Sequence, residues 1–202
     1  LLAFAQNDFK RLVAYSSISH MGFILLGLYA WNQQAAQGAI MQIFAHGLST
    51  AALFMTAGAL QYRLHTRDMS RMGGLWADMP RMGAVSLFFV AASLGMPGLG
   101  NFIAEFLVLL GLFAVHPVAA VLASLGLVTA AVYALTLMQR AFYGTPVPGR
   151  NLRDYGAREM VTMALLMLGL LLLGLYPQAL FNLTQPLAEG LAGLGNTRGL
   201  AP

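Results

Sequence analysis

Long apolar stretches separated by short basic segments make up most of the chain. A helix needs about twenty apolar residues to cross the hydrocarbon core of a bilayer. Four stretches reach this length as simple spans: Leu12 to Ala30, Ala35 to Tyr62, Val118 to Gln139 and Met160 to Leu180. The hydrophobic pattern therefore predicts an all-α integral membrane protein.

A fifth apolar stretch, Met82 to Val115, is interrupted near its middle. As one straight helix it would run about 50 Å at 1.5 Å per residue, well beyond a hydrocarbon core of about 30 Å. The interruption reads GMPGLG, in which Pro97 removes a backbone donor and Gly98 permits non-helical dihedrals. We predict two half-helices joined by an unwound segment, whose free backbone groups are buried in protein or line a hydrated cavity.

The composition agrees with this class of protein. Hydrophobic residues make up 58% of the 202 residues and charged residues 9%, whereas about a quarter of the residues in a soluble domain are charged. The absence of cysteine excludes a disulfide framework and thiolate metal sites. We expect residues 1–202 to form a single membrane domain. Because Leu1 to Ala5 looks like the end of an earlier helix, we expect it to be the C-terminal part of a longer chain.

The basic residues fall in alternate loops. The segments before the first span, between the second and third, and between the fourth and fifth contain Lys10, Arg11, Arg63, Arg67, Arg71, Arg81, Arg140, Arg150, Arg153 and Arg158. The other loops contain neither Lys nor Arg, and the tail has Arg198. The positive-inside rule makes the basic side cytoplasmic. This scatter between spans, rather than along one face, argues against nucleic-acid binding.

Three ionisable side chains, His20, His46 and Glu105, are predicted at bilayer depth. Such groups are costly there and usually serve proton or ion traffic. Histidine titrates near pH 6.5, so His20 and His46 could relay protons with the help of water. The alternative for each histidine is a neutral residue that satisfies a neighbouring helix by hydrogen bonding.

Glu105 lies one turn into the second predicted half-helix, after Asn101. The helix N-terminus favours its ionised form and burial opposes it, so its proton affinity should depend on hydration and neighbouring charge. The competing explanation is a structural glutamate that caps glycine or asparagine backbone groups. Hydroxyls near the histidines, such as Ser17 and Ser19, could hold a file of water or simply pack helices together.

The run AQNDFKRLVAYSSISHMG, which ends at Gly22, closely resembles the signature of the proton-translocating antiporter-like subunits of respiratory complex I. Further segments support this resemblance: HGLSTAALF from His46, HTRDM from His65, GGLW from Gly73, and GMPGLGNF before Glu105. The likeness covers nearly the whole chain and fades after about Pro177. The loop segments, and Glu rather than Lys at the broken helix, favour the bacterial NADH-quinone oxidoreductase branch.

The resemblance implies about five transmembrane helices, one of them broken, that form most of the second inverted repeat of an antiporter-like bundle. It implies a bacterial cytoplasmic membrane subunit that pumps protons while NADH oxidation and quinone reduction occur elsewhere in the complex. NADH, FMN, iron-sulfur clusters and quinone are expected in other parts, with no cofactor or metal in this chain. The implied partners are the other membrane subunits, especially neighbouring antiporter-like subunits, and the lipid bilayer.

The resemblance also assigns roles to single residues. His20 and His46 would carry protons along a central hydrophilic axis, and Glu105 would pass them toward the periplasm. The residues expected to support this route as polar groups or at the helix break are Ser17, Ser19, Pro97, Gly98 and Asn101.

Other functions remain open at this stage. A subunit of a multisubunit cation/proton antiporter or of a membrane-bound hydrogenase shares the fold and the YSSISH run. A structural scaffold would have no need of buried acid and histidine on successive spans. A quinone pocket could be lined by Phe88, Phe89 and Phe102, although such residues more commonly pack or face lipid.

Overall fold

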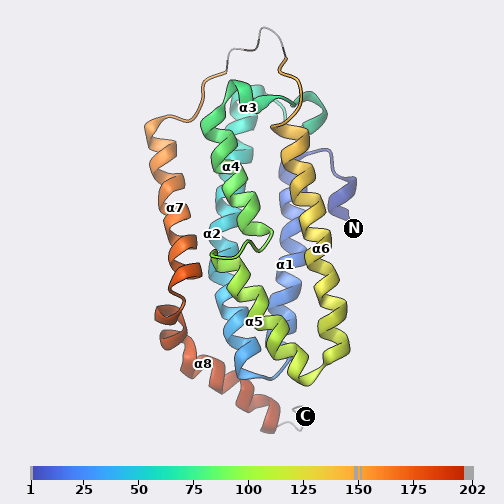
Figure 1. The fold of residues 1–202 in the computed structure, drawn as a ribbon, viewed down its shortest axis with the longest axis vertical. Helices are drawn as coiled ribbons and strands as arrows, with labels where there is room; N and C mark the ends of the chain where they lie inside the picture. Colours follow the sequence, from blue (N-terminus) through green and yellow to red (C-terminus); the bar gives the residue numbers. More distant parts are fainter. Residues whose placement is uncertain (1, 148–149, 151, 198–202) are drawn as a thin grey trace.

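The structure is a computed structural model that describes residues 2–147, 150 and 152–197. Most of its helices run side by side along one axis, and the last one crosses the end of the bundle (Figure 1). The elements are η1 (Leu2–Ala5), α1 (Phe9–Tyr29), α2 (Gln33–Leu64), η2 (Met69–Arg71), α3 (Leu75–Asp78), α4 (Pro80–Ser93), α5 (Gly100–Val115), α6 (Pro117–Ala141), α7 (Ala157–Leu175) and α8 (Gln178–Thr197).

Local sequence sets where several of these helices begin. The carboxylate of Asp8 accepts the backbone N–H of Arg11 at the start of α1, and the side chain of Asn32 caps α2 in the same way. Proline occupies the first position of α4 and of α6, where its missing N–H costs no helical hydrogen bond.

Each predicted span corresponds to a helix, or for the broken span to two helices, in the structure. Within the described residues, α1, α2, α6 and α7 are long and apolar enough to cross a membrane. The helices α4 and α5 are shorter, with 14 and 16 residues, and follow one another end to end as the two halves of the broken span (Figure 1). With 32 residues, α2 would run about 48 Å, so it is longer than the hydrocarbon core is thick.

The break between α4 and α5 lies at the predicted glycines. Gly95 and Gly98 have φ of 71° and 94°, in the left-handed region that favours glycine. On the neighbouring helix α7, Gly174 packs directly against the backbone of Gly98 and Leu99, where a side chain would collide. The backbone at Gly98 and Leu99 is therefore covered by α7, whereas Met96 and Pro97 of the same segment are exposed.

The last predicted span is wrong at its C-terminal end. Met160 to Leu180 was expected to be one helix, but α7 ends at Leu175, just before Pro177, and α8 begins at Gln178. The helix α8 was not predicted from the sequence, and its apolar residues share one face among polar ones. This helix crosses the end of the bundle (Figure 1), where Ala188 packs with Ala36 and Ile40.

Small residues bring α2 and α5 into close contact. Gly38 on α2 faces the backbone of Ala104 and Val108, and Gly111 on α5 faces Ala35. A methyl group at either glycine would collide with the opposite helix. Close packing of this kind is typical of membrane helices, and it places the polar side chains of α2 and α5 within hydrogen-bonding distance.

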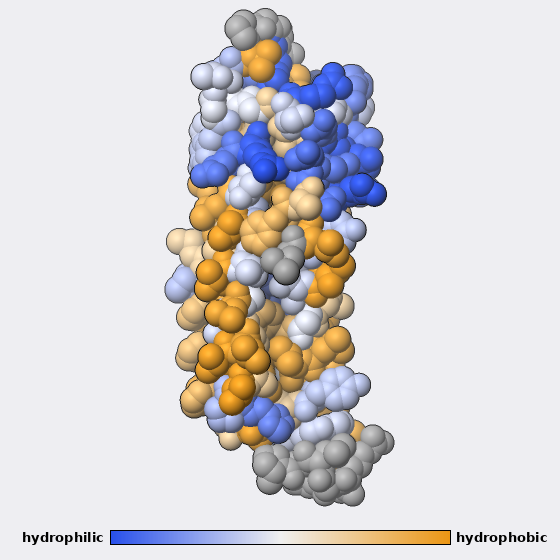
Figure 2. Space-filling view, turned by 90° about the vertical axis from the view of Figure 1, so that its right-hand side faces the viewer, coloured by the Kyte–Doolittle hydropathy of each residue, from blue (hydrophilic) through white to orange (hydrophobic). Residues whose placement is uncertain are grey.

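One end of the bundle is basic. The start of α1, the ends of α2 and α6 and the start of α7 meet there (Figure 1). Figure 2 shows hydrophilic residues gathered at this end above a broad apolar band. The loop carboxylates pair locally, as for Asp8 with Arg67 and Asp78 with Arg150. The one basic residue predicted for the tail, Arg198, lies outside the described residues.

Candidate functional site

Glu105 meets polar side chains from two other helices inside the bundle. The glutamate on α5 is only 3% exposed. Its Oε1 lies 2.8 Å from Nδ1 of His20 on α1 and accepts a hydrogen bond from Nε2 of Gln42 on α2 at 3.0 Å. Three helices therefore converge on one carboxylate oxygen.

The second carboxylate oxygen faces the helix break. A methyl group placed on Gly95 would lie 3.1 Å from Oε2 of Glu105, so this oxygen points at the unwound segment. The two oxygens of Glu105 thus have different surroundings. Oε1 contacts the side chains of His20 and Gln42, and Oε2 faces the unwound backbone at Gly95. A proton received on the histidine side can leave on the other side once the carboxyl group turns about the Cγ–Cδ bond.

His20 extends the cluster toward α6 and α2. Its Nε2 lies 3.2 Å from the hydroxyl of Tyr133, and its ring centre lies 5.0 Å from that of His46. A neutral His20 that donates from Nδ1 to Glu105 can accept from the tyrosine hydroxyl at Nε2, so one tautomer satisfies both contacts. His46 in turn contacts the hydroxyl of Thr50, 3.1 Å from its Nε2.

Amide groups beside the cluster have spare acceptors. Nδ2 of Asn101 donates to Oγ of Ser49, 3.3 Å away, and Ser49 donates to the backbone oxygen of His46. Within the described part of the chain, Oδ1 of Asn101 and Oε1 of Gln42 are buried without a hydrogen-bond partner. A buried acceptor left unpaired costs about 1–3 kcal/mol, so both atoms favour a proton donor such as water.

The structure brings together the three residues predicted at bilayer depth, His20, His46 and Glu105. The competing assignment for Glu105 was a structural cap on backbone groups. In the structure its carboxylate instead contacts side chains of other helices. Pro97 lies in the helix break as expected, and Asn101 lies beside it at the start of α5.

Two predicted supporting residues make no hydrogen bond to the cluster among the described residues. The Ser17 hydroxyl donates to the backbone oxygen of Val13 within α1. Among the described residues, Ser19 shows no side-chain hydrogen bond to the cluster. Their part in proton transfer stays a prediction.

Two members of the cluster were missed in the sequence. Gln42 precedes His46 by four residues on the same helix, so the two share a face, and this spacing was a usable signal. Tyr133 lies among apolar residues of α6 with no pattern to distinguish it. Its contact with His20 depends on how α1 and α6 pack.

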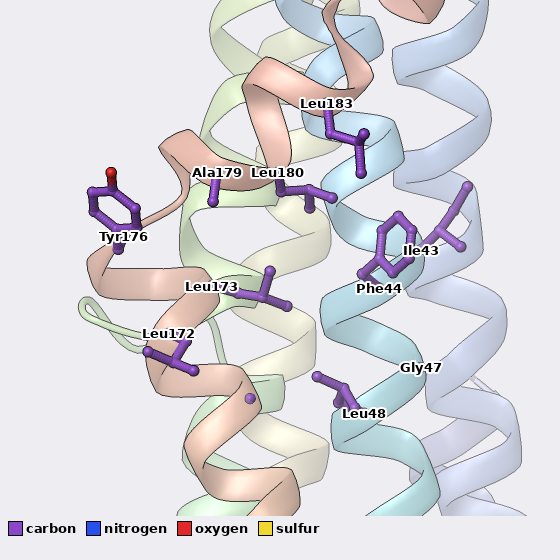
Figure 3. A pocket seen from close by; sticks show the side chains of 11 residues that line it. Ile43, Phe44, Gly47, Leu48, Leu172, Leu173, Tyr176, Ala179, Leu180 and Leu183 are labelled. Carbon is purple, nitrogen blue, oxygen red and sulfur yellow. The ribbon is translucent and has the colours of Figure 1, made fainter.

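An apolar pocket includes none of the residues of this cluster in its lining. Figure 3 shows it between α2, α7 and α8, lined by residues such as Phe44, Leu48, Leu173 and Leu180. It has a volume of about 750 Å³. Its lining has no acid, base or amide, and the ring of Tyr176 points away from it in Figure 3, so it offers no group for proton transfer.

The family described as NADH:quinone oxidoreductase/Mrp antiporter, transmembrane, matches residues 1–132. The chain belongs to this family. Subunit M of the NADH-quinone oxidoreductase of Pseudomonas aeruginosa is 51% identical over 191 residues, which are 95% of this chain and 38% of that protein. Subunit M of Escherichia coli K12 is 50% identical over 184 residues, 90% of this chain and 36% of that protein.

Two solved structures of related complexes share the fold of this chain. A chain in the respiratory complex I of Thermus thermophilus with bound NADH superimposes with a TM-score of 0.89 at 38% identity, covering 96% of this chain and 41% of that one. A chain of the Mrp complex from Dietzia shares the fold, with a TM-score of 0.85 at 18% identity over 98% of this chain and 45% of that one. The resemblance to antiporter-like subunits of complex I is confirmed. The chain spans less than half the length of these relatives.

Proposed function

We propose that this chain is the proton-releasing part of an antiporter-like membrane subunit of an NADH-quinone oxidoreductase. It would move protons through buried side chains while NADH oxidation and quinone reduction occur elsewhere in the complex. The observation that carries the proposal is the contact between His20 and Glu105, with His46 adjacent, inside an apolar helical bundle. The chain itself would have no redox role.

The geometry supports a route in three steps. A proton reaches His46 and passes to His20 across the 5.0 Å between their ring centres, with a water or hydroxyl group as carrier. His20 then gives the proton on Nδ1 to Oε1 of Glu105, 2.8 Å away. In this transfer His20 receives the incoming proton at Nε2, the atom beside the Tyr133 hydroxyl, so that it stays neutral after the loss from Nδ1, and a change of tautomer restores the hydrogen on Nδ1 before the next proton.

Release from Glu105 would occur on the opposite side of the carboxyl group. After rotation of the carboxyl group about the Cγ–Cδ bond, the protonated oxygen of Glu105 would take the place of Oε2, which faces Gly95 and the unwound segment, and would lose its proton there. Redox energy from the rest of the complex would drive this by shifting the proton affinities of the coupled groups through the charges along the axis. The His20–Glu105 pair has no net charge while it holds one shared proton, and it carries one negative charge after release, which favours uptake of the next proton.

The orientation and partners follow from charge and from the relatives. The basic end would face the cytoplasm and α8 would lie on the periplasmic side of a bacterial inner membrane. The partners would be the other membrane subunits, including neighbouring antiporter-like subunits, and the missing length of the relatives would contribute further residues to the route.

A subunit of a cation/proton antiporter complex is the second candidate. The observation that favours it is the shared fold of the Mrp complex chain from Dietzia. The relatives at about half identity are instead subunits of NADH-quinone oxidoreductases. A quinone pocket has less support, because Phe89 is fully buried in the helical core.

The test is Glu105→Gln in the full-length subunit, within the assembled complex. This change removes the charge and keeps the shape, so we expect most proton translocation per NADH oxidised to be lost while the amount of complex stays near wild type. Glu105→Asp should lose less. The readout is proton uptake by reconstituted vesicles, measured with sodium present and absent. Near-normal pumping by the Gln variant would contradict the proposal, and a strict need for sodium would favour the antiporter candidate.

A further inference from the structure

Two adjoining cavities open between α2 and α7 at the basic end of the bundle. The first, of about 490 Å³, is lined by residues that include Tyr62, Arg63, Arg153, Arg158 and Glu159, and is called here the basic cavity. The second, of about 370 Å³, is lined in part by Met55, Ala59, Thr162 and Met163, and is called the apolar groove. Arg158 and Glu159 line both, so the two cavities form one continuous opening.

The acid in this opening is already neutralised. Nη2 of Arg63 donates to both oxygens of Glu159, at 2.9 and 2.8 Å. The same carboxylate accepts the backbone N–H of Gly156 at 2.8 Å, just before α7 begins. Arg63 also donates to the backbone oxygen of Arg153, and its guanidinium lies over the ring of Tyr155. The ion pair of Arg63 and Glu159 therefore links α2 to α7 and has no net charge.

The nearest other acid is also engaged. Oδ2 of Asp154 accepts the backbone N–H of Arg81, and Oδ1 accepts those of Met82 and Tyr155, at 2.7 to 3.0 Å. Asp154 thereby caps the start of α4, which has no cap from its own segment. The carboxylate of Asp154 is therefore bound by backbone N–H groups and not by Arg153 or Arg158.

Two cations are left in the basic cavity. Arg153 and Arg158 are exposed, and among the described residues neither guanidinium has a hydrogen-bond partner. Arg153 is close enough to Glu159 for a weak electrostatic interaction, but that carboxylate is already held by Arg63. The basic cavity thus carries a net positive charge and would attract an anion.

The apolar groove indicates which kind of anion fits. It extends from Arg158 to Met163 on α7, about 8 Å along the helix, and on α2 it reaches Met55, which lies about 12 Å along the helix from Arg63 of the basic cavity. It therefore enters the hydrocarbon layer, whose half-thickness is about 15 Å. Tyr62, 81% exposed beside the basic cavity, is typical of the membrane interface. A soluble anion would use the cavity alone, whereas a ligand with a phosphate and an acyl chain would use both parts.

We propose that Arg153 and Arg158 bind the phosphate of an anionic phospholipid, with one of its acyl chains in the apolar groove between α2 and α7. Basic pockets between transmembrane helices next to apolar surface are the usual sites for acidic lipid headgroups. The lipid would join the ends of α2 and α7 at the surface where Arg63 and Glu159 already hold them. This site is separate from the His20–Glu105 cluster and does not depend on the proton-transfer proposal.

The experiment uses the full-length subunit in its assembled complex. The complex is reconstituted in phosphatidylcholine vesicles that contain a minor share of phosphatidylglycerol with a photoreactive acyl chain, and crosslinked peptides are mapped after illumination. We expect crosslinks in residues 55–62 and 156–163. Arg153→Gln with Arg158→Gln should reduce them about tenfold or more, because each arginine near a lipid surface contributes roughly a factor of five in affinity.

Matched changes separate charge from shape. Lys10→Gln with Arg11→Gln removes the same charge from the same end of the bundle, away from the groove, and should leave the crosslinks unchanged. Ala59→Phe fills the groove and keeps both arginines, and should also abolish the crosslinks. Equal labelling by a photoreactive phosphatidylcholine, or equal losses in the two charge-removing variants, would overturn the proposal. So would crosslinks from residues 55–62 to another subunit in place of lipid.

Discussion

His20 and Glu105 are 85 positions apart in the chain, yet Nδ1 of the histidine lies 2.8 Å from Oε1 of the glutamate. Both side chains are almost fully buried, with 2% and 3% exposed. A buried acid and base at this distance can share or exchange one proton at little electrostatic cost, whereas either alone would be costly at this depth. The predictions below test whether the protein uses this contact for proton transfer.

The two histidines should act as one relay. Ala at His20 or at His46 should each slow proton transfer, and the double variant should lose less than the sum of the two effects, because a broken chain cannot be broken twice. The measurement is proton pumping together with complex content for both single variants and the double variant. Additive losses that follow a reduced amount of complex would indicate that the histidines only pack the helices.

Gln42 should tune the carboxylate. Gln42→Ala removes the donor to Oε1 of Glu105, and a hydrogen bond to a charged group contributes about 1.5–3 kcal/mol. We expect pumping to fall severalfold with most of the complex still assembled. Gln61→Ala, on the exposed surface of the same helix, is the matched control. Equal pumping in the two variants would remove Gln42 from the site.

Tyr133 should assist His20 rather than carry the proton alone. Tyr133→Phe deletes the hydroxyl beside Nε2 of His20 and keeps the ring. We expect a smaller loss of pumping rate, which corresponds to an increase of about 0.5–1.5 kcal/mol in the free-energy barrier to proton transfer. Tyr143→Phe, at an exposed tyrosine stacked on Trp76, provides the comparison. Pumping rates that stay equal across wild type and both variants would show that the hydroxyl only fills space.

The helix break should provide the exit for the proton. Gly95→Ala places a methyl group 3.1 Å from Oε2 of Glu105 and also strains a residue at φ 71°. Gly98→Ala strains a residue at φ 94°, but its methyl group meets nothing within 4 Å. Backbone strain of this kind costs roughly 1–2 kcal/mol, so both variants should lose similar thermal stability. Pumping should fall much further in Gly95→Ala. Equal pumping would place the exit elsewhere.

Much of the fold could be predicted because membrane spans are local features. The length of an apolar run and the positions of Pro97 and its glycines are visible in the chain, and the bilayer imposes the rest. The end of α7 was mispredicted because the residues after Pro177 are still fairly apolar, and a window of hydropathy cannot separate a crossing helix from one that lies across the bundle. The helix α8 depends on its contact with Ala36 and Ile40 of α2.

The candidate site divides in the same way. The sequence by itself determined that His20, His46 and Glu105 each lie inside a long apolar run, and from this it predicted that they lie at bilayer depth. It could not pair them, because a hydrogen bond between α1 and α5 depends on helix rotation and on the close approach that Gly38 and Gly111 permit. Only the tertiary structure added Gln42 and Tyr133 and assigned one oxygen of Glu105 to the histidine and the other to the break. Distances between helices are decided by packing, and no pattern within one helix encodes them.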